Sequence, residues 1–332
     1  MPKGSNQKLK LLYLKKILLE HTDEAHAITL SEILEALAGY GVVAERKSIY
    51  DDLEALRLYG LDVERRGRYY FVANRTFQLP ELKLLVDAVQ SCKFITQRKS
   101  AELIKKLGGL ASRHEARMLQ RQVYVSGRVK TANEQIYYNI DRLHEAIAQG
   151  EQISFRYFEW QLDFSIQGSL RKHYRREGER YQVSPWALAW EDENYYLIAY
   201  DAMSGGVRHY RVDKMEDIQL TGQRREGMKL MERFDVGTYT SKLFGMFGGE
   251  EQEVRLQFSN RLVGVVVDRF GRDRMFSRVD SEHFAVTVRV VVSPQFLSWL
   301  FGFGQEAMVL SPKPVVDQMR RMATQVAEQY LN

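Results

Sequence analysis

The chain has 332 residues, of which 45% are hydrophobic and 27% are charged, and its formal net charge is +5 at pH 7. This composition is ordinary for a globular protein, and the length predicts two or three domains, each with enough apolar residues for a core. The single cysteine, Cys92, excludes an intramolecular disulfide framework and a cysteine-rich zinc site.

The N-terminal segment and the charge distribution indicate the compartment and the kind of partner. The N-terminal residues lack the apolar segment of a signal peptide, and no stretch approaches a membrane span, so we expect a cytoplasmic protein without membrane attachment. Positive charge is concentrated between residues 76 and 130, where 11 Lys and Arg outnumber 4 Asp and Glu. Such a segment favours contact with nucleic acid, and a solvated helix face is the alternative explanation.

The first 75 residues predict three helices followed by a β-ribbon. Apolar periodicity predicts a helix over residues 8–21, and Thr29–Glu32 has the pattern of a capping box that begins a second helix. A third helix is expected over about 44–59, and short strands are expected at 61–64 and 68–72. This order is typical of a winged helix-turn-helix DNA-binding domain.

The remaining residues predict three further regions. A helical linker is expected over 76–135, with helices in 80–120 and a crossing segment at 129–133. A helix at 136–149 precedes a change to period-two alternation, and five short strands up to residue 225 indicate a small β-barrel. Residues 226–250 are interpreted as a connector. Over 251–332 we expect strands at 253–259, 275–279, 283–292 and 306–310 and helices at 260–270, 294–303 and 312–330. The predicted fold class is therefore a multidomain α+β protein.

The third predicted helix carries the residues expected to bind DNA. If Ile49, Leu53 and Leu56 point inward, helical geometry places Lys47 and Asp51 outward, with Ser48 and Tyr50 at the flanks. Bases on such a helix bind guanine or phosphate, and basic residues at a ribbon tip bind phosphate or the minor groove. The expected DNA-binding residues are Arg46, Lys47, Ser48, Tyr50, Arg65, Arg66 and Arg68. The alternative is an ordinary charged surface helix.

Aromatic and basic residues coincide on the strands predicted at 194–200 and 207–214. Arginine binds phosphate in bidentate fashion, tyrosine stacks on bases, and histidine adds a donor whose charge depends on pH. The candidates for binding a negatively charged ligand are Arg156, Tyr196, Arg208, His209, Arg211 and Lys214. Because side chains alternate along a strand, Arg208 and Tyr210 point away from His209 and Arg211, so the four share one pocket only at a bulge or a rim position, and we favour the latter pair. In the alternative, Tyr195, Tyr196 and Tyr200 are core and the bases are solvated.

Nothing in the sequence predicts catalysis, a cofactor or a metal. Gly302-Phe303-Gly304 lacks the third glycine of a dinucleotide site, and His21 and His26 have poor metal-ligand spacing. No serine or cysteine nucleophile has a placed partner, so we expect the chain not to be an enzyme.

Several segments, in order, resemble the WYL-domain transcriptional regulators. In the predicted barrel these are Ser184–Leu188, Tyr195–Asp201 and Tyr210–Met215, with Tyr195 where the name-giving tryptophan usually stands and Lys214 for a frequent arginine. The third helix resembles the family's helix-turn-helix at Arg46, Ser48, Ile49, Asp52, Leu53 and Leu56. Asp51 stands where the family often has arginine. It either reads a cytosine amino group or shifts the DNA contacts to the ribbon.

The resemblance covers essentially the whole chain and implies both fold and function. It implies a winged helix over 1–75, and a Sm-like/SH3-like barrel over 136–225 that senses nucleic-acid fragments or nucleotides and couples them to DNA binding. It also implies a ferredoxin-like C-terminal extension (WCX) over 251–332 that is implicated in dimer assembly. The expected protein is a bacterial-type regulator, a homodimer that binds a duplex DNA operator and a single-stranded nucleic acid or nucleotide effector. We expect the basic helices of 76–130 to couple the two sites. The alternatives are a single-stranded RNA-binding post-transcriptional factor and an enzyme acting on nucleotides.

Overall fold

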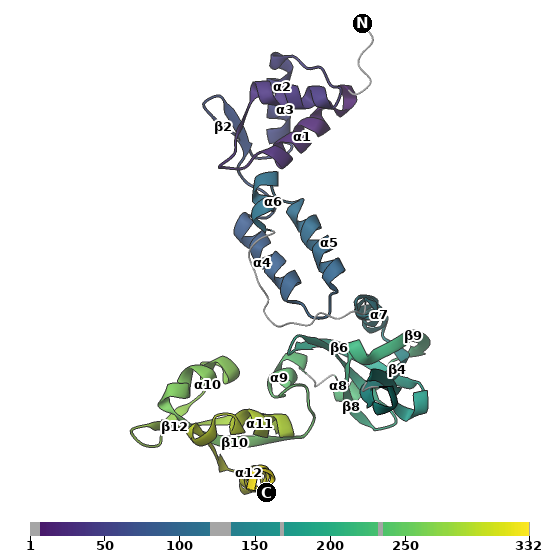
Figure 1. The fold of residues 1–332 in the computed structure, drawn as a ribbon, viewed down its shortest axis with the longest axis vertical. Coiled ribbons are helices and arrows are strands. Elements are labelled where there is room, and N and C mark those ends of the chain that lie inside the picture. Colours follow the sequence, from purple (N-terminus) through teal and green to yellow (C-terminus); the bar gives the residue numbers. More distant parts are fainter. Residues whose placement is uncertain (1–6, 120–133, 167–168, 232–234, 332) are drawn as a thin grey trace. The chain divides into compact units, whose positions relative to one another are not determined.

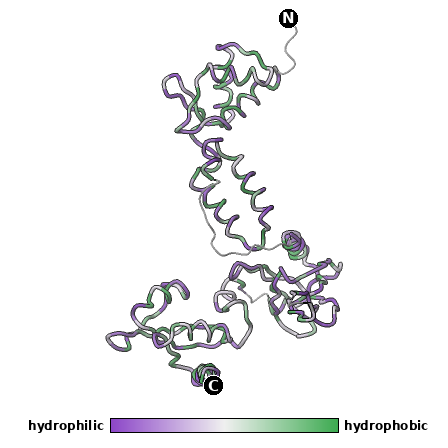
Figure 2. Tube along the Cα trace, viewed as in Figure 1, coloured by the Kyte–Doolittle hydropathy of each residue, from purple (hydrophilic) through white to green (hydrophobic). Residues whose placement is uncertain are grey.

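The structure is a computed structural model that describes residues 7–119, 134–166, 169–231 and 235–331. It divides into two compact units, residues 1–134 and 135–332 (Figure 1). The crossing segment expected at 129–133 lies outside the described residues. Hydrophobic and hydrophilic residues are interspersed along the helices of both units (Figure 2). Among the described helices, none combines the length and apolar character needed to span a membrane.

The first unit contains the three helices and the ribbon that the sequence predicts. Its elements are a 3-10 turn at Gln7–Leu9, α1 (Lys10–His21), β1 (Ile28–Thr29), α2 (Leu30–Gly39), α3 (Arg46–Leu58), β2 (Val63–Arg66), β3 (Tyr69–Val72), α4 (Leu79–Ser91), α5 (Gln97–Gly108) and α6 (Arg113–Leu119). The predicted capping box is confirmed, because the Thr29 hydroxyl accepts from the Glu32 backbone while the Glu32 carboxylate accepts from the Thr29 backbone. The strand β1, which was not predicted, pairs with β3 to complete a three-stranded sheet.

The predicted orientation of α3 is confirmed. Ile49, Leu53 and Leu56 are buried in a core shared with α1 and α2, whereas Lys47 and Asp51 are exposed. The apolar spacing therefore fixes which face of α3 reaches the solvent.

A buried polar network joins α6 to the loop after α1. Asp23 is almost fully buried, and its carboxylate accepts hydrogen bonds from the Ser112 hydroxyl and from the backbone N–H of Ala25 and His26. Burial alone would raise the pKa of Asp23, but these hydrogen bonds hold that pKa below its ordinary value. The ring of His26 stacks on that of His114 with centroids 3.9 Å apart. These contacts lie at the junction between the three-helix domain and the helices that follow it.

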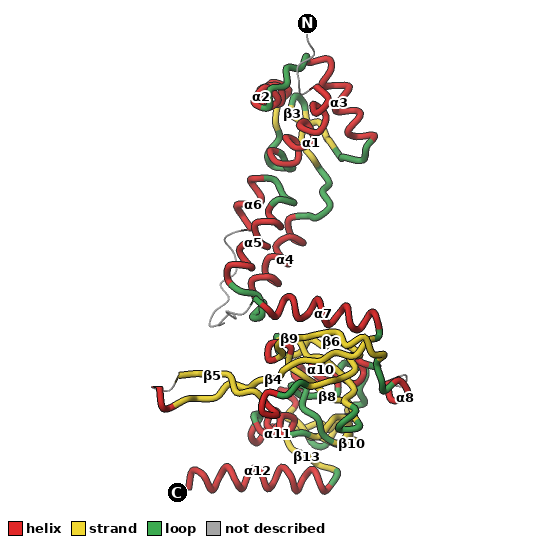
Figure 3. Tube along the Cα trace, turned by 90° about the vertical axis from the view of Figure 1, so that its right-hand side faces the viewer, coloured by secondary structure: helices red, strands yellow, loops and turns green. Residues whose placement is uncertain are grey.

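The second unit begins with a helix and a curled six-stranded sheet. Its elements are α7 (Gln135–Gln149), β4 (Glu151–Asp163), β5 (Ser169–Tyr174), β6 (Tyr181–Glu191), β7 (Asn194–Asp201), β8 (Gly206–Arg211) and β9 (Met215–Arg224), with 3-10 turns at Phe164–Ile166, Arg175–Gly178 and Val212–Lys214. The order is β5-β4-β6-β7-β8, and β9 also pairs with β4. The prediction of five strands was wrong by one, because β5 was missed. The long β4 continues past the main sheet and pairs with β5 as a hairpin that projects from the unit (Figure 3).

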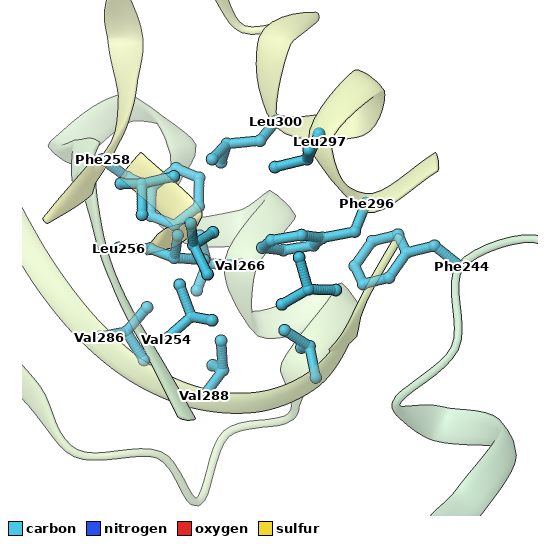
Figure 4. Close-up of a cluster of buried hydrophobic side chains, with 14 of the residues drawn as sticks. Phe244, Val254, Leu256, Phe258, Val266, Val286, Val288, Phe296, Leu297 and Leu300 are labelled. Carbon is cyan, nitrogen blue, oxygen red and sulfur yellow. The ribbon is translucent and has the colours of Figure 1, made fainter. Parts of the chain in front are cut away.

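The C-terminal part of this unit is an antiparallel four-stranded sheet with helices. Its elements are α8 (Met228–Met231), α9 (Val236–Ser241), β10 (Glu250–Ser259), a 3-10 turn at Asn260–Leu262, α10 (Val263–Phe270), β11 (Phe276–Arg278), β12 (His283–Val292), α11 (Pro294–Phe301), a 3-10 turn at Gly304–Glu306, β13 (Ala307–Ser311) and α12 (Lys313–Leu331). The order β11-β12-β10-β13 and the β-α-β-β-α-β succession are those that a ferredoxin-like domain requires. Alternate residues of β10 and β12 form its core with Phe296 and Leu300 (Figure 4).

Candidate nucleic-acid interface and ligand cavity

A polar groove of about 560 Å³ lies between α2, α3 and the ribbon of β2 and β3. Its lining contains four of the residues expected to bind DNA, namely Arg46, Tyr50, Arg65 and Arg68. Glu32 is the carboxylate in this groove, and the hydrogen bond from the Thr29 backbone lowers its pKa, so it remains ionised. The groove therefore brings the start of α3 and the ribbon, which are about 20 residues apart in sequence, to one surface.

Aromatic rings hold the arginines of the ribbon. The guanidinium of Arg65 lies 5.7 Å from the ring centroid of Tyr70, and that of Arg68 lies 5.2 Å from the centroid of Tyr69. Arg66 lies similarly over Phe71, at 5.0 Å. Within the described chain, no carboxylate forms an ion pair with these three arginines. Their charges are thus available to phosphate while their positions are restricted.

The other predicted DNA-binding residues of α3 lie as follows. Lys47 is exposed. Ser48 is half-buried and accepts a hydrogen bond from the Lys10 ammonium, which also pairs with Asp52 at 2.7 Å. The Arg46 guanidinium is 3.4 Å from the Ser31 hydroxyl. Ser48 is therefore tied to α1 by a basic side chain that sequence reasoning did not select.

A second, larger cavity of about 950 Å³ lies in the other unit. It is lined by β8, by the turn after β5 and by the connector loop, which we define as residues 244–249. Five of the six predicted ligand-binding residues line it, namely Tyr196, Arg208, His209, Arg211 and Lys214. Arg175 and Arg176 line it as well, so the lining has five Lys and Arg residues against two carboxylates, Asp201 and Glu251, although Arg175 and Arg211 are paired with Glu159 and Asp213 outside the lining. This excess of positive charge suits an anionic ligand.

Arg211 is the most constrained cation of the cavity. Its Nε and Nη2 atoms donate to the two carboxylate oxygens of Asp213 at 3.0 and 2.8 Å, and Nη2 also donates to the Asn194 side chain. The hydrogen bond to Asp213 raises the pKa of Arg211. Its backbone N–H donates to the hydroxyl of Tyr157. The charge is therefore already balanced by an internal partner that a ligand phosphate has to replace.

Buried tyrosines form the floor of this cavity. Tyr157, Tyr181 and Tyr210 are each less than 10% exposed and pack edge to face with one another. Burial raises the pKa of Tyr157 to about 12 and also raises that of Tyr210. The tyrosines that the alternative interpretation placed in the core, Tyr195, Tyr196 and Tyr200, are half-buried instead, and Tyr196 lines the cavity.

His209 uses both ring nitrogens for contacts within the protein. Its Nδ1 lies 2.8 Å from the Met246 carbonyl oxygen, which can only accept, so Nδ1 carries the proton. Its Nε2 lies 3.1 Å from the Tyr239 hydroxyl, which donates to it in the neutral ring. Burial lowers the pKa of His209, and the bond to Met246 opposes this shift.

Two sequence-based expectations bear on this cavity. Alternation along β8 allows all four of its residues to share one pocket only at a bulge or a rim, and β8 is an edge strand whose two faces both meet the cavity. Arg156 does not line the cavity, since its guanidinium pairs with Asp217 and lies over the Tyr174 ring. The residues missed were Arg175 and Arg176, and the basic turn before Gly178 is the only sequence signal for them.

Across the residues that the structure describes, no three His, Cys, Asp or Glu side chains converge in a way that could hold a metal ion.

Two domain families match the sequence of the second unit. The WYL domain profile matches residues 138–220, and the WCX domain profile matches residues 250–327. The chain therefore contains a WYL domain followed by a WCX domain. The cavity lies on the WYL domain and is completed by the connector and by Glu251 and Val291 of the WCX domain.

Solved structures offer more distant likenesses. Proteasome accessory factor B/C (PafBC) of Arthrobacter aurescens is 18% identical, with a TM-score of 0.29, over 99% of this chain and 50% of that chain. A CRISPR Cas-related protein is 15% identical, with a TM-score of 0.36, over 76% of this chain and 71% of that chain. The chain thus spans half the length of the PafBC chain. No curated protein sequence matches it.

Proposed function

We propose that this protein is a ligand-responsive, DNA-binding transcriptional regulator that acts in the cytoplasm as a homodimer and has no catalytic activity. Residues 1–75 act as a winged helix that binds a duplex operator. The WYL domain, a Sm-like/SH3-like barrel, binds a single-stranded nucleic acid or a nucleotide, and the WCX domain contributes to the dimer.

The groove of the first unit supports the DNA-binding part. Arg46 at the start of α3 and the ribbon arginines line or flank one groove, and no described carboxylate pairs with them. The first residues of such a helix meet base edges in the major groove while the ribbon contacts the backbone. Asp51 is exposed on α3, so it either meets a cytosine amino group or shifts the DNA contacts to the ribbon.

The single observation that carries the ligand-binding part is the composition of the WYL cavity. Its five cations, together with the half-buried Tyr196, match the requirements of a phosphate-bearing ligand with an unpaired base. Its volume lies within the usual range for ligand sites, which is roughly 300–1,000 Å³. Regulation further requires that the ligand bind one arrangement of the dimer better than the other.

The direct test of the DNA-binding part uses duplex DNA from upstream of the protein's own gene. Affinity for this duplex, for a scrambled duplex and for a single strand is measured between about 50 and 200 mM salt. We expect preference for the native duplex and a steep loss of affinity with salt. Preference for single strands, without duplex selectivity, would instead favour the RNA-binding alternative.

The ligand-binding part is tested by replacing one cation of the cavity. Arg211→Ala removes the guanidinium held by Asp213 and Asn194, so we expect the response to the ligand to be lost while duplex binding is retained. Turnover assays with a nucleotide panel complete the test. A full response in the Arg211→Ala protein would contradict the site, and turnover would contradict the absence of catalysis.

A further inference from the structure

One arginine of the WYL cavity rests on an aromatic ring. The guanidinium carbon of Arg176 lies 4.0 Å from the ring centroid of Tyr181. Its Nη2 atom is 3.9 Å from the Asp201 carboxylate, which is too far for a hydrogen bond. Its Nη1 atom donates to the Met203 sulfur, a weak acceptor, at 3.4 Å. Among the described residues, no oxygen accepts a hydrogen bond from this guanidinium.

Two other arginines of the cavity are engaged more tightly. Arg175, the preceding residue, donates from Nε to the Glu159 carboxylate at 2.7 Å. Arg211 donates to both carboxylate oxygens of Asp213, at 3.0 and 2.8 Å. A ligand phosphate has to replace these partners before it gains a hydrogen bond. Arg176 has no such partner to give up, so a phosphate that binds it displaces no hydrogen-bonded carboxylate.

Arg208 and Lys214 complete the set of cations but are held less firmly. Arg208 donates to the Ser204 hydroxyl at 3.1 Å, and Lys214 forms no ion pair within the described part of the chain. Neither lies over an aromatic ring among those residues. A long side chain that moves freely loses conformational entropy when a ligand fixes it, and this loss weakens binding. Of the five cations in the described lining, Arg176 thus combines a fixed position with the absence of a hydrogen-bonded carboxylate.

The turn after β5 is strained where it carries Arg176. Arg176 and Glu177 have positive φ, at 51° and 54°, which residues other than glycine rarely adopt. Residues in such conformations cluster at ligand sites and persist where surrounding contacts fix them. Tyr181 supplies such a contact, since it is 7% exposed and packs edge to face with Tyr157 and Tyr210. The floor beneath Arg176 is therefore held in place by the core.

This contact leaves the hydrogen-bonding edge of Arg176 open. A cation–π contact uses the face of the guanidinium, whereas a phosphate binds along its edge, where the N–H donors lie in one plane. The side chain is 32% exposed and lines the cavity, so a phosphate in the cavity reaches that edge. The arginines of the ribbon, which lie over Tyr69, Tyr70 and Phe71, are held in the same way.

We propose that Arg176, seated on the Tyr181 ring, anchors a phosphate of the ligand, and that the turn Arg175–Gly178 forms a phosphate subsite of the WYL cavity. This inference rests on the proposed function and assigns the ligand's phosphate to one place within the cavity. The phosphate supplies the oxygen acceptors that the guanidinium lacks. The phosphates of a single strand and of a nucleotide both meet this requirement.

The test compares two adjacent arginines in the full-length protein. Arg176→Ala removes the ring-held cation, and Arg175→Ala removes the cation that pairs with Glu159. Both substitutions change the net charge equally, and the control also leaves Glu159 without its partner, so a purely electrostatic effect is at least as large there. Fluorescence anisotropy of a labelled single-stranded oligo(dT) gives the affinity between about 50 and 200 mM salt.

We expect Arg176→Ala to weaken oligo(dT) binding roughly 10-fold and to lower the slope of log affinity against log salt by about 0.7, as for one phosphate contact on a single strand. Arg175→Ala should cost several-fold less affinity and leave the slope unchanged, because its cation stays with Glu159. An equal or larger loss in Arg175→Ala would overturn the assignment, and so would an unchanged slope in Arg176→Ala.

Arg176→Lys retains the charge and decides the question should the alanine variant fail to fold. An ammonium is a point charge without the planar fork of arginine, so we expect binding several-fold weaker than in the wild type. Wild-type affinity in this variant would show that only the charge matters and would contradict the role of the ring-held edge.

Thymidine triphosphate, titrated by calorimetry, distinguishes the two sources of phosphate. A loss of affinity in Arg176→Ala for the strand, for the nucleotide or for both supports the subsite and identifies which phosphate it takes. Equal affinities of the wild type and Arg176→Ala for both probes would contradict this assignment alone. Failure of the wild type to bind either probe would contradict the proposed ligand class together with the assignment.

Discussion

The arginines of the ribbon and those of the WYL cavity are held by different kinds of partner. Arg65, Arg66 and Arg68 lie over aromatic rings and form no ion pair with a carboxylate of the described chain, and Glu32 attracts Arg68 across the groove. In the cavity, Arg211 forms a bidentate pair with Asp213, and Arg175 pairs with Glu159. The first set is positioned without ion pairs, whereas the second set contains them.

This difference has a consequence for binding. A phosphate that reaches the ribbon displaces water and counterions, so its affinity depends mainly on salt. A phosphate that reaches Arg211 must also replace Asp213, so much of the gain is offset by a lost internal pair. We therefore expect the ribbon to bind polyanions generally. We expect the cavity to bind its ligand more weakly per phosphate charge, so that the ligand dissociates readily, as a sensor requires.

The largest effect is expected from destabilising the hydrophobic core of the first unit. Leu53 is 1% exposed in the core of α1–α3, so Leu53→Ala should lower the free energy of unfolding of this unit by about 2–5 kcal/mol. Leu58, which is 84% exposed on the same helix, provides the matched control Leu58→Ala. Thermal unfolding and duplex binding report the change. Loss of oligo(dT) binding in Leu53→Ala would show that the two sites are not separable.

A smaller effect is expected from the ribbon. The double substitution Arg65→Ala and Arg68→Ala should weaken duplex binding on the order of 10- to 100-fold and lower the slope of log affinity against log salt by about 2. Arg320→Ala with Arg321→Ala removes the same charge from α12 and serves as the control. The slope comes from a salt titration of duplex affinity. An unchanged slope in the ribbon variant would exclude these arginines from phosphate contact.

The smallest effect is expected from removing the carboxylate that pairs with Arg211 in the cavity. Asp213→Asn removes the internal carboxylate from Arg211, and we expect single-stranded oligo(dT) to bind several-fold more tightly, with duplex affinity unchanged. Fluorescence anisotropy of a labelled oligonucleotide measures this gain. Weaker binding would mean that Asp213 mainly positions Arg211 and that exchange of partners is not the mechanism.

The sequence predicted local features better than long-range ones. The capping box at Thr29, the inner face of α3 and the strands and helices of the C-terminal domain follow from periodicity and capping, which act within a few residues. The hairpin of β4 and β5 was missed because its pairing extends beyond the main sheet. The turn that follows β5 brings Arg175 and Arg176 to the cavity, so these residues were missed with it.

The cavity also shows where the geometry of the predicted residues differs from what the sequence suggested. Tyr196, Arg208, Arg211 and Lys214 were predicted and line one cavity, but alternation alone could not reveal that β8 is an edge strand. His209 was predicted as a ligand contact from its residue type. Its partners, Met246 and Tyr239, are about 30 residues or more away, and only the folded chain shows that both nitrogens are occupied.

The most direct test of two separate and coupled anion sites is a titration of single-stranded oligo(dT) into the complex of the full-length protein with a labelled operator duplex. We predict that the oligonucleotide changes duplex affinity to a saturating limit in the wild type and has no such effect in Arg211→Ala. Complete displacement of the duplex, equal in both proteins, would show that single and double strands compete for the ribbon and would contradict the account.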